Sequence, residues 1–228
     1  KERNVGKTCV LSCGYGVSAQ RFSDTLLRQN VRLADSDAEH FAQAAQAHSI
    51  YRRVNFKIVE FWSTCGRVIQ DLCSFHTAGV HGYFGRGDLF EYGWDNVPCT
   101  SVSAPYIRMP NGFRLWYPGL RYDAEGGMVY DRVVHGKPTP KRVYGASIAE
   151  NVTQSLAFQM LAWQACRMAD AGIQIKANIH DAFIAVCKSS ELDRTKQTME
   201  KIMKETPSWL SGFPVDCEAE TGNDFTIA

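Results

Sequence analysis

The sequence predicts an α+β fold, with a helical N-terminal part followed by short strands, a long helix and a final strand-and-helix segment. Apolar residues recur at helical spacing up to about residue 72, and short strand-like runs occupy residues 105–145 between Gly- and Pro-containing turns. The 228 residues, 45% of them hydrophobic and 21% charged, have the composition of a soluble globular protein with one core or two small ones.

Helices dominate the predicted N-terminal part. Residues 1–30 are expected to form a helix that is interrupted at residues 14–16 and resumes from residue 19 to residue 29. Ser36, followed three residues later by Glu39, predicts a capping box at the start of the next helix. Residues 79–96 are rich in Gly and aromatic residues and lack periodicity, so we expect a loop there.

Strands and helices alternate in the rest of the chain. We expect two strands at residues 114–118 and 128–134, followed by a helix at 147–171. Two further strands are expected at 173–179 and 183–186, and a last helix at 190–206. A turn is expected at residues 123–127, and Gly172 is expected to end the long helix. Ser190 with Asp193 predicts the N-terminal cap of the last helix, and Pro207 ends it.

The composition narrows the functional classes. A net charge of +1 is not that of a globally basic nucleic-acid-binding protein, so a DNA-binding surface must be local. No run of about 18 apolar residues exists, which excludes a membrane span, and no secretory signal is evident. The eight scattered cysteines indicate reduced thiols and a cytoplasmic location. A zinc site could be formed by Cys65, Cys73, His76 and His81. Structural zinc sites usually start with two cysteines two to four residues apart, however, and these two are eight apart, so buried thiols and loop histidines are the favoured interpretation.

A basic stripe opens the chain. Arg3, Lys7, Leu11 and Tyr15 follow one another at intervals of four residues, which keeps them near one face of a helix. Two cations followed by an apolar and an aromatic residue suit a nucleoside triphosphate, with the cations at the phosphates and the ring near the base. The alternative is an amphipathic surface helix with two solvated cations.

His180 and Asp181 lie where one predicted strand ends and the next begins. A carboxylate at a hairpin tip is a good metal ligand because two strands fix its position before the metal arrives. Phosphoryl transfer by two Mg²⁺ ions requires such carboxylates. The alternative is a hairpin turn in which Asp makes only local hydrogen bonds.

The first pattern, R-x3-K-x7-Y-G, resembles the O-helix motif of family A DNA polymerases. The resemblance implies that Arg3 and Lys7 hold the triphosphate of the incoming dNTP and that Tyr15 stacks near the templating base. Leu11 departs from the Phe or Tyr that is usual in the family, at a position that influences sugar discrimination. Single-subunit RNA polymerases share much of this motif, so a fragment of such an enzyme is an alternative.

The second pattern is similar to the H-D-E motif of the polymerase palm. By this resemblance Asp181 binds metal, as part of a site for two Mg²⁺ ions, and His180 approaches the primer terminus. Ala182 replaces the Glu of the motif, so a second carboxylate is missing at the turn. This departure motivates another alternative, a non-catalytic DNA-binding subunit with a polymerase-like fold.

Further segments resemble bacteriophage members of the family in the same order along the chain, at residues 109–117, 144–154 and 218–222. The match implies that Gln154, with Asn151, contacts the primer–template DNA; the alternative for Gln154 is a polar residue on the exposed side of its helix. Phe158 and Trp163 are expected in the core. A right-hand polymerase would then have its fingers portion in residues 1–100 and its palm portion in residues 101–228.

Family A enzymes carry another aspartate upstream of the O helix, in a D-Y-S-x-x-E segment that is absent here. We therefore expect this chain to be inactive by itself. An upstream segment or a complementing N-terminal polymerase fragment would supply the second aspartate, and the complete enzyme would act on dNTPs and primer–template DNA in the cytoplasm of a phage-infected bacterium.

Overall fold

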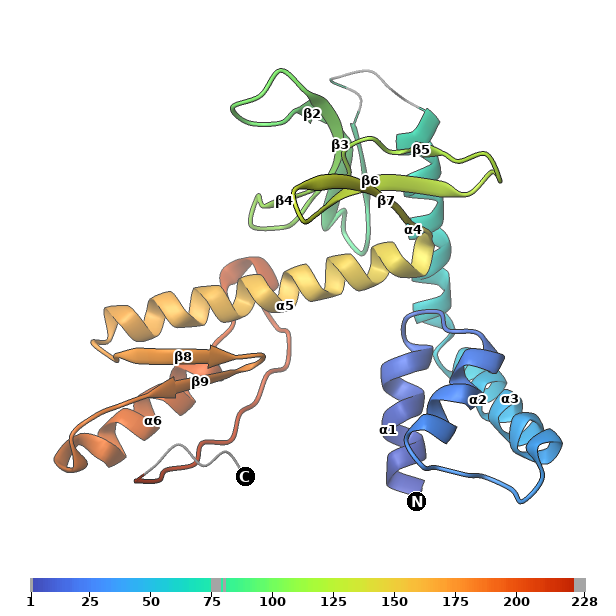
Figure 1. The fold of residues 1–228 in the computed structure, drawn as a ribbon. Helices are drawn as coiled ribbons and strands as arrows, with labels where there is room; N and C mark the ends of the chain where they lie inside the picture. The colour runs from blue at the N-terminus through green and yellow to red at the C-terminus, as the bar shows by residue number, and fades with distance from the viewer. Residues whose placement is uncertain (1, 75–78, 80, 224–228) are drawn as a thin grey trace. The chain divides into compact units, whose positions relative to one another are not determined.

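The computed structural model describes residues 2–74, 79 and 81–223, and it confirms an α+β chain of six α-helices and antiparallel sheets (Figure 1). The chain forms two compact units, Lys1–Thr153 and Gln154–Ala228, and each is described by itself. The division falls within the long helix α5 (Gly145–Asp170). None of the helices in the described ranges has the length and apolar character that crossing a membrane requires.

Four helices open the first unit: α1 (Glu2–Cys13), α2 (Ala19–Arg28), α3 (Asp37–Val54) and α4 (Phe56–Ser74). The predicted interruption at residues 14–16 is confirmed. The cap of α3 is confirmed as well, since the Ser36 hydroxyl accepts a 3.2 Å hydrogen bond from the Glu39 N–H. Helices α1 to α3 share a core that consists of Cys13, Phe22, Leu26, Val31 and Ala44.

The expectation of a loop over residues 79–96 is wrong. Strands β1 (His81–Phe84) and β2 (Phe90–Asn96) pair with each other, and β3 (Ser103–Arg108) and β4 (Arg114–Trp116) complete an antiparallel sheet in the order β1-β2-β3-β4. Phe84 and Phe90 are buried, and their rings lie 6.3 and 6.4 Å from the Phe61 ring of α4. Packing against a helix distant in sequence therefore stabilises strands that lack local periodicity.

A second sheet consists of β5 (Arg121–Tyr122), β6 (Met128–Val134) and β7 (Lys137–Arg142). The predicted turn at residues 123–127 joins β5 to β6, and its Asp123 N–H donates to the Gly127 carbonyl at 2.7 Å. His135 and Gly136 form a two-residue turn between β6 and β7, with φ of 49° and 75°. Positive φ at both positions is typical of the tightest β-hairpins.

The second unit contains the C-terminal part of α5, the hairpin β8 (Ile175–Ile179) and β9 (Ala182–Ala185), and α6 (Leu192–Met203). Short 3₁₀ helices lie at Ser189–Glu191 and Ser208–Leu210. Gly172 has a φ of 78° and follows α5, as the sequence predicts. The predicted Ser190 cap is wrong, because Ser190 lies in the 3₁₀ turn and no side chain caps α6.

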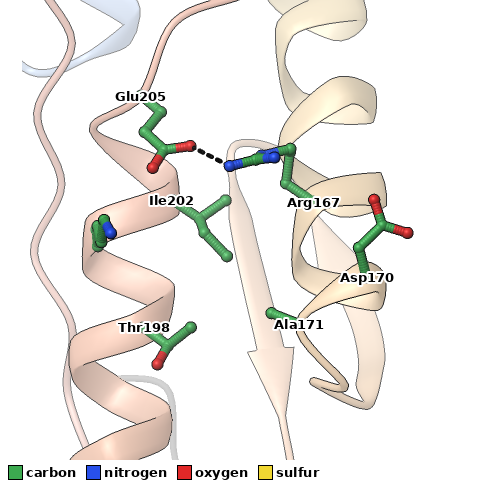
Figure 2. Close-up of a pocket in the computed structure, with 7 residues that line it drawn as sticks. Arg167, Asp170, Ala171, Thr198, Ile202 and Glu205 are labelled. Carbon is green, nitrogen blue, oxygen red and sulfur yellow. Dashed lines mark hydrogen bonds and ion pairs between the residues drawn. The ribbon is translucent and has the colours of Figure 1, made fainter.

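Helices α5 and α6 are joined at the C-terminal end of α6. The buried Gln164 side chain donates hydrogen bonds to the Met203 and Glu205 carbonyls at 2.9 and 3.2 Å, which satisfies carbonyl groups where the helix ends. Arg167 pairs with Glu205 at 3.1 Å (Figure 2).

The expectation that Phe158 lies in the core is wrong: its side chain is 69% exposed, while its neighbours Ser155 and Gln159 are buried. Trp163 is half-buried.

Cysteine reactivity provides a test of the core. Burial raises the pKa of the Cys65 thiol to about 12, and burial together with the neighbouring Cys9 raises the pKa of Cys13 to about 12. Because the thiolate is the nucleophile, both should resist maleimide at about pH 8, whereas exposed Cys99 and Cys166 should react within minutes. Mass spectrometry of the labelled peptides measures this difference, and labelling in urea is the control. Equal rates for Cys65 and Cys99 in the folded chain would contradict the packing around α4.

Candidate functional site

The basic stripe lies on the exposed face of α1. Arg3, Lys7 and Leu11 are all exposed, and successive members are separated by about 6 Å of helix rise. The opposite face of the helix packs against α2 and α3 through Cys13 and its neighbours. Leu11, which follows the two cations on this face, is 60% exposed and is therefore not part of the core. The predicted face is confirmed for Arg3, Lys7 and Leu11, but not for Tyr15, which lies beyond the end of α1 at Cys13. A role of this face in dNTP binding stays a prediction.

Tyr15 is half-buried in the turn that follows α1. The indole N–H of Trp62, in α4, donates a 3.2 Å hydrogen bond to the Gly14 carbonyl. Gly16 has a φ of 75°, and a Cβ built there would lie only 2.5 Å from the Cβ of Ala146 in α5. The turn that carries Tyr15 is therefore packed between α4 and the beginning of α5, with no room for a side chain at residue 16.

The start of α5 is in backbone contact with α4. A Cβ at Gly145 would lie 2.0 Å from the Trp62 carbonyl oxygen and 2.9 Å from the Gly66 nitrogen. Trp62 thus contacts the Tyr15 turn through its side chain and Gly145 through its backbone. As a result, two segments that the sequence matches separately, residues 3–16 and 144–154, meet within the first unit through Gly16 and Ala146.

The residues after Tyr15 are held by α3. A ring nitrogen of His48 lies 2.8 Å from the Val17 carbonyl, and the Arg52 guanidinium donates to the same oxygen at 3.3 Å. Arg52 also lies over the Trp62 ring, at 5.6 Å from its centroid. The part that His48 plays here was not predictable from the sequence, because a histidine inside a helix carries no signal of its distant backbone partner.

Asn151 and Gln154 occupy different environments on α5. Asn151 is half-buried, and its amide donates a 3.2 Å hydrogen bond to the Tyr117 hydroxyl, whose pKa is raised by burial. This contact joins the predicted segments 109–117 and 144–154. Gln154 is exposed and is the first residue of the second unit. Contact of either residue with DNA stays a prediction.

His180 and Asp181 form a two-residue hairpin turn, since Ile179 pairs directly with Ala182 across β8 and β9. Both turn residues are exposed, and His180 has a φ of 55°. The Asn178 amide donates to the Ala182 carbonyl at 3.2 Å, which closes the tip. The predicted position of the carboxylate at a hairpin tip is confirmed, but its catalytic role stays a prediction. A left-handed backbone at a non-glycine residue is uncommon, although His tolerates it better than most residues.

One carboxylate at this tip does not make a two-metal centre. Among the residues that the structure describes, no three His, Cys, Asp or Glu side chains gather where they could hold a metal ion. Asp181 belongs to the second unit and Lys7 to the first, so their convergence on one nucleotide stays a prediction. In the zinc candidate, Cys65 and Cys73 are buried, and His76 lies outside the described residues.

A shallow depression between α5 and α6 contains none of the predicted site residues (Figure 2). Its lining residues are Arg167, Asp170, Ala171, Thr198, Lys201, Ile202 and Glu205. The Arg167–Glu205 ion pair joins α5 to the segment that directly follows α6.

The sequence has a known relative. A DNA polymerase of Bacillus phage SP02 is 27% identical over 231 residues, a match that covers 95% of this chain and 31% of that polymerase. The chain is distantly related to a phage DNA polymerase. It spans about a third of the length of that relative. No family model and no solved structure matches the chain.

Proposed function

We propose that this chain is part of a template-directed DNA polymerase that adds dNTPs to the 3′ end of a primer. The observation that carries the proposal is the relation to a phage DNA polymerase along 95% of the chain. Because the match covers 31% of that polymerase, the remaining parts of the enzyme would come from residues outside these 228, in the same polypeptide or in a partner chain. We also propose that the enzyme belongs to family A, with residues 1–100 in its fingers and residues 101–228 in its palm.

The α1 stripe is the proposed dNTP-binding surface. Arg3 and Lys7 are exposed cations one helical turn apart, which suits the separate phosphates of a triphosphate. Leu11 would contact the sugar, and Tyr15 would lie near the templating base. The close packing of Gly14 and Gly16 against neighbouring helices supports this role, because it fixes the turn before a nucleotide binds.

The β8–β9 turn is the proposed catalytic tip. Asp181 would contribute one carboxylate to a Mg²⁺ site, and His180 would approach the primer terminus. Divalent cations at such a site neutralise the charge that develops on the transferred phosphoryl group. Since Asp181 alone does not hold two ions, the proposal requires at least one further carboxylate, which an upstream segment or a partner chain would supply.

Primer extension tests the proposal. The chain is assayed with a primed template, alone and together with the polypeptide that precedes it or copurifies with it, using dNTPs or rNTPs in parallel. The expected result is extension that obeys the template, prefers dNTPs and requires the second component. Extension with rNTPs only would favour the RNA polymerase alternative, and the absence of any template-dependent extension would refute the proposal.

Lys7→Ala should reduce kcat/KM for dNTPs in the complemented enzyme. The expected reduction is about 10- to 100-fold, because a charge-assisted hydrogen bond to phosphate contributes about 1.5–3 kcal/mol. Steady-state kinetics at varied dNTP concentration measures the change, and duplex DNA affinity should stay within about twofold. Lys57→Ala, on the exposed side of α4, is the matched control and should leave kcat/KM unchanged. Equal losses in the two variants would contradict a specific role for α1.

A further inference from the structure

The β5–β7 sheet contains neither candidate site, and its two faces differ in charge. Side chains alternate along a strand, and residues paired across strands share a face. Tyr130 pairs with Lys141, Arg132 with Thr139, and Val134 with Lys137. Arg132, Lys137 and Lys141 therefore lie on one face, which we call the Arg132 face. Burial raises the pKa of the Tyr130 phenol and the Arg132 charge partly offsets this, as expected for neighbours on one face.

The cations of the opposite face are paired with carboxylates. Arg121 pairs with Asp131, whose carboxylate is 3.0 Å from the guanidinium. Arg142 pairs with Asp123 at 3.3 Å and also with Glu125. The cations of this face are thus neutralised within the sheet, and the field that they present to a polyanion is weak.

The Arg132 face has no such compensation. Arg132, Lys137 and Lys141 are all exposed, and no acidic residue occupies this face of the β6–β7 hairpin. Within the described ranges, none of the three makes an ion pair with a carboxylate. Three cations on one side of a short hairpin, with their counterparts on the other side neutralised, favour a negatively charged partner.

The hairpin also limits which partner fits. β7 is an edge strand, and it contains Pro138 and Pro140. Proline has no N–H to donate, so this edge is protected against pairing with a strand from another chain. The two-residue turn at His135 and Gly136 keeps β6 and β7 in a fixed register. A partner would therefore bind through the charged face rather than through the edge.

We propose that the Arg132 face binds the phosphate backbone of double-stranded DNA. Lys137 and Lys141 are about 13 Å apart along β7, and Arg132 lies opposite the midpoint, so a cation occurs about every 6.6 Å. Phosphates follow one another every ~3.4 Å along the axis of each DNA strand, so long cationic side chains at this spacing reach separate phosphates. The inference rests on the proposed function, since the relation to a DNA polymerase makes DNA the expected polyanion.

Salt-dependent binding tests this surface. Lys137→Gln/Lys141→Gln is compared with Arg121→Gln/Arg142→Gln, which changes the net charge equally on the opposite face. The affinity of the 228-residue chain for a labelled duplex of mixed sequence is measured by anisotropy from about 50 to about 200 mM salt, without nucleotide. The slope of log affinity against log salt is negative, and in the lysine variant it should be less steep by about 1.8, or about 0.9 per phosphate contact removed. Over this range that difference corresponds to about a 12-fold smaller loss of affinity.

The arginine control should keep the wild-type slope, and both variants should melt within a few degrees of wild type because all four residues are exposed. Equal slopes for the lysine variant and wild type, or no duplex binding by wild type, would overturn the proposal. Binding to anionic phospholipid vesicles but not to duplex would overturn it in favour of a membrane surface.

Template-directed synthesis is measured in a separate assay, so that the two proposals can fail independently. If synthesis requires Asp181 while the lysine variant keeps the wild-type slope, only the surface proposal fails. If the slope becomes less steep in the lysine variant but no template-dependent synthesis exists, only the polymerase proposal fails.

Discussion

Asp181→Asn should abolish nearly all template-directed synthesis by the complemented enzyme. Asparagine keeps the size of the side chain but removes its negative charge, so the tip loses the group proposed to hold a divalent cation. The expected decrease in kcat is about 100- to 1,000-fold or more, the range for loss of one preorganised electrostatic group. Single-turnover incorporation of one dNTP measures the chemical step directly.

Duplex binding separates this effect from a loss of structure. The asparagine side chain fits the exposed turn, so Asp181→Asn should bind duplex DNA as wild type does. Asp193→Asn provides a matched control, because Asp193 is exposed in the first turn of α6 and has no proposed role. Full synthesis by Asp181→Asn would favour a non-catalytic DNA-binding subunit, the interpretation that Ala182 already motivates.

Gly145→Ala should destabilise the first unit. The new Cβ would lie 2.0 Å from the Trp62 carbonyl oxygen, so the backbones of α4 and α5 must move apart. Overpacking of this kind costs about 1–3 kcal/mol, and we expect the upper end because the colliding atom belongs to the backbone. At about 2–4 °C per kcal/mol for a chain of this size, the Tm should fall by about 6–12 °C. Tryptophan fluorescence during heating measures the change, since Trp62 lies at the contact.

Gly6→Ala is the control for this substitution. Gly6 lies within α1, and a Cβ there meets no atom within 4 Å. Alanine should therefore stabilise the helix by about 0.5–1 kcal/mol, the usual cost of glycine in a helix interior. A Gly145→Ala protein that melts at the wild-type temperature would show that α4 and α5 do not meet as described.

The local features of both candidate sites were predictable from the sequence. The exposed stripe of Arg3, Lys7 and Leu11 follows from helical periodicity, which depends only on neighbouring residues. The tip at His180 and Asp181 follows from the end of an alternating run, because strand spacing and two-residue turns are also local. The break between α1 and α2 was predictable from Gly14 and Gly16 for the same reason.

The long-range contacts were not predictable in this way. Residues 81–96 form strands because Phe84 and Phe90 pack on Phe61 of α4, and a short Gly-rich segment carries no periodic signal of such a partner. Phe158 was expected in the core, yet it is exposed, because segments distant in the chain decide which face of α5 is covered.

The sequence by itself determined the order of helices and turns, the exposed basic stripe and the carboxylate at a hairpin tip, since each depends on residues a few positions apart. Only the tertiary structure decided that Trp62, Gly145 and Ala146 support the Tyr15 turn. It also decided that, among the residues described, carboxylates pair with the cations on one face of β5–β7 and not with those on the other. Those arrangements depend on which distant backbones come within a few ångströms of each other, and residue spacing does not specify that distance.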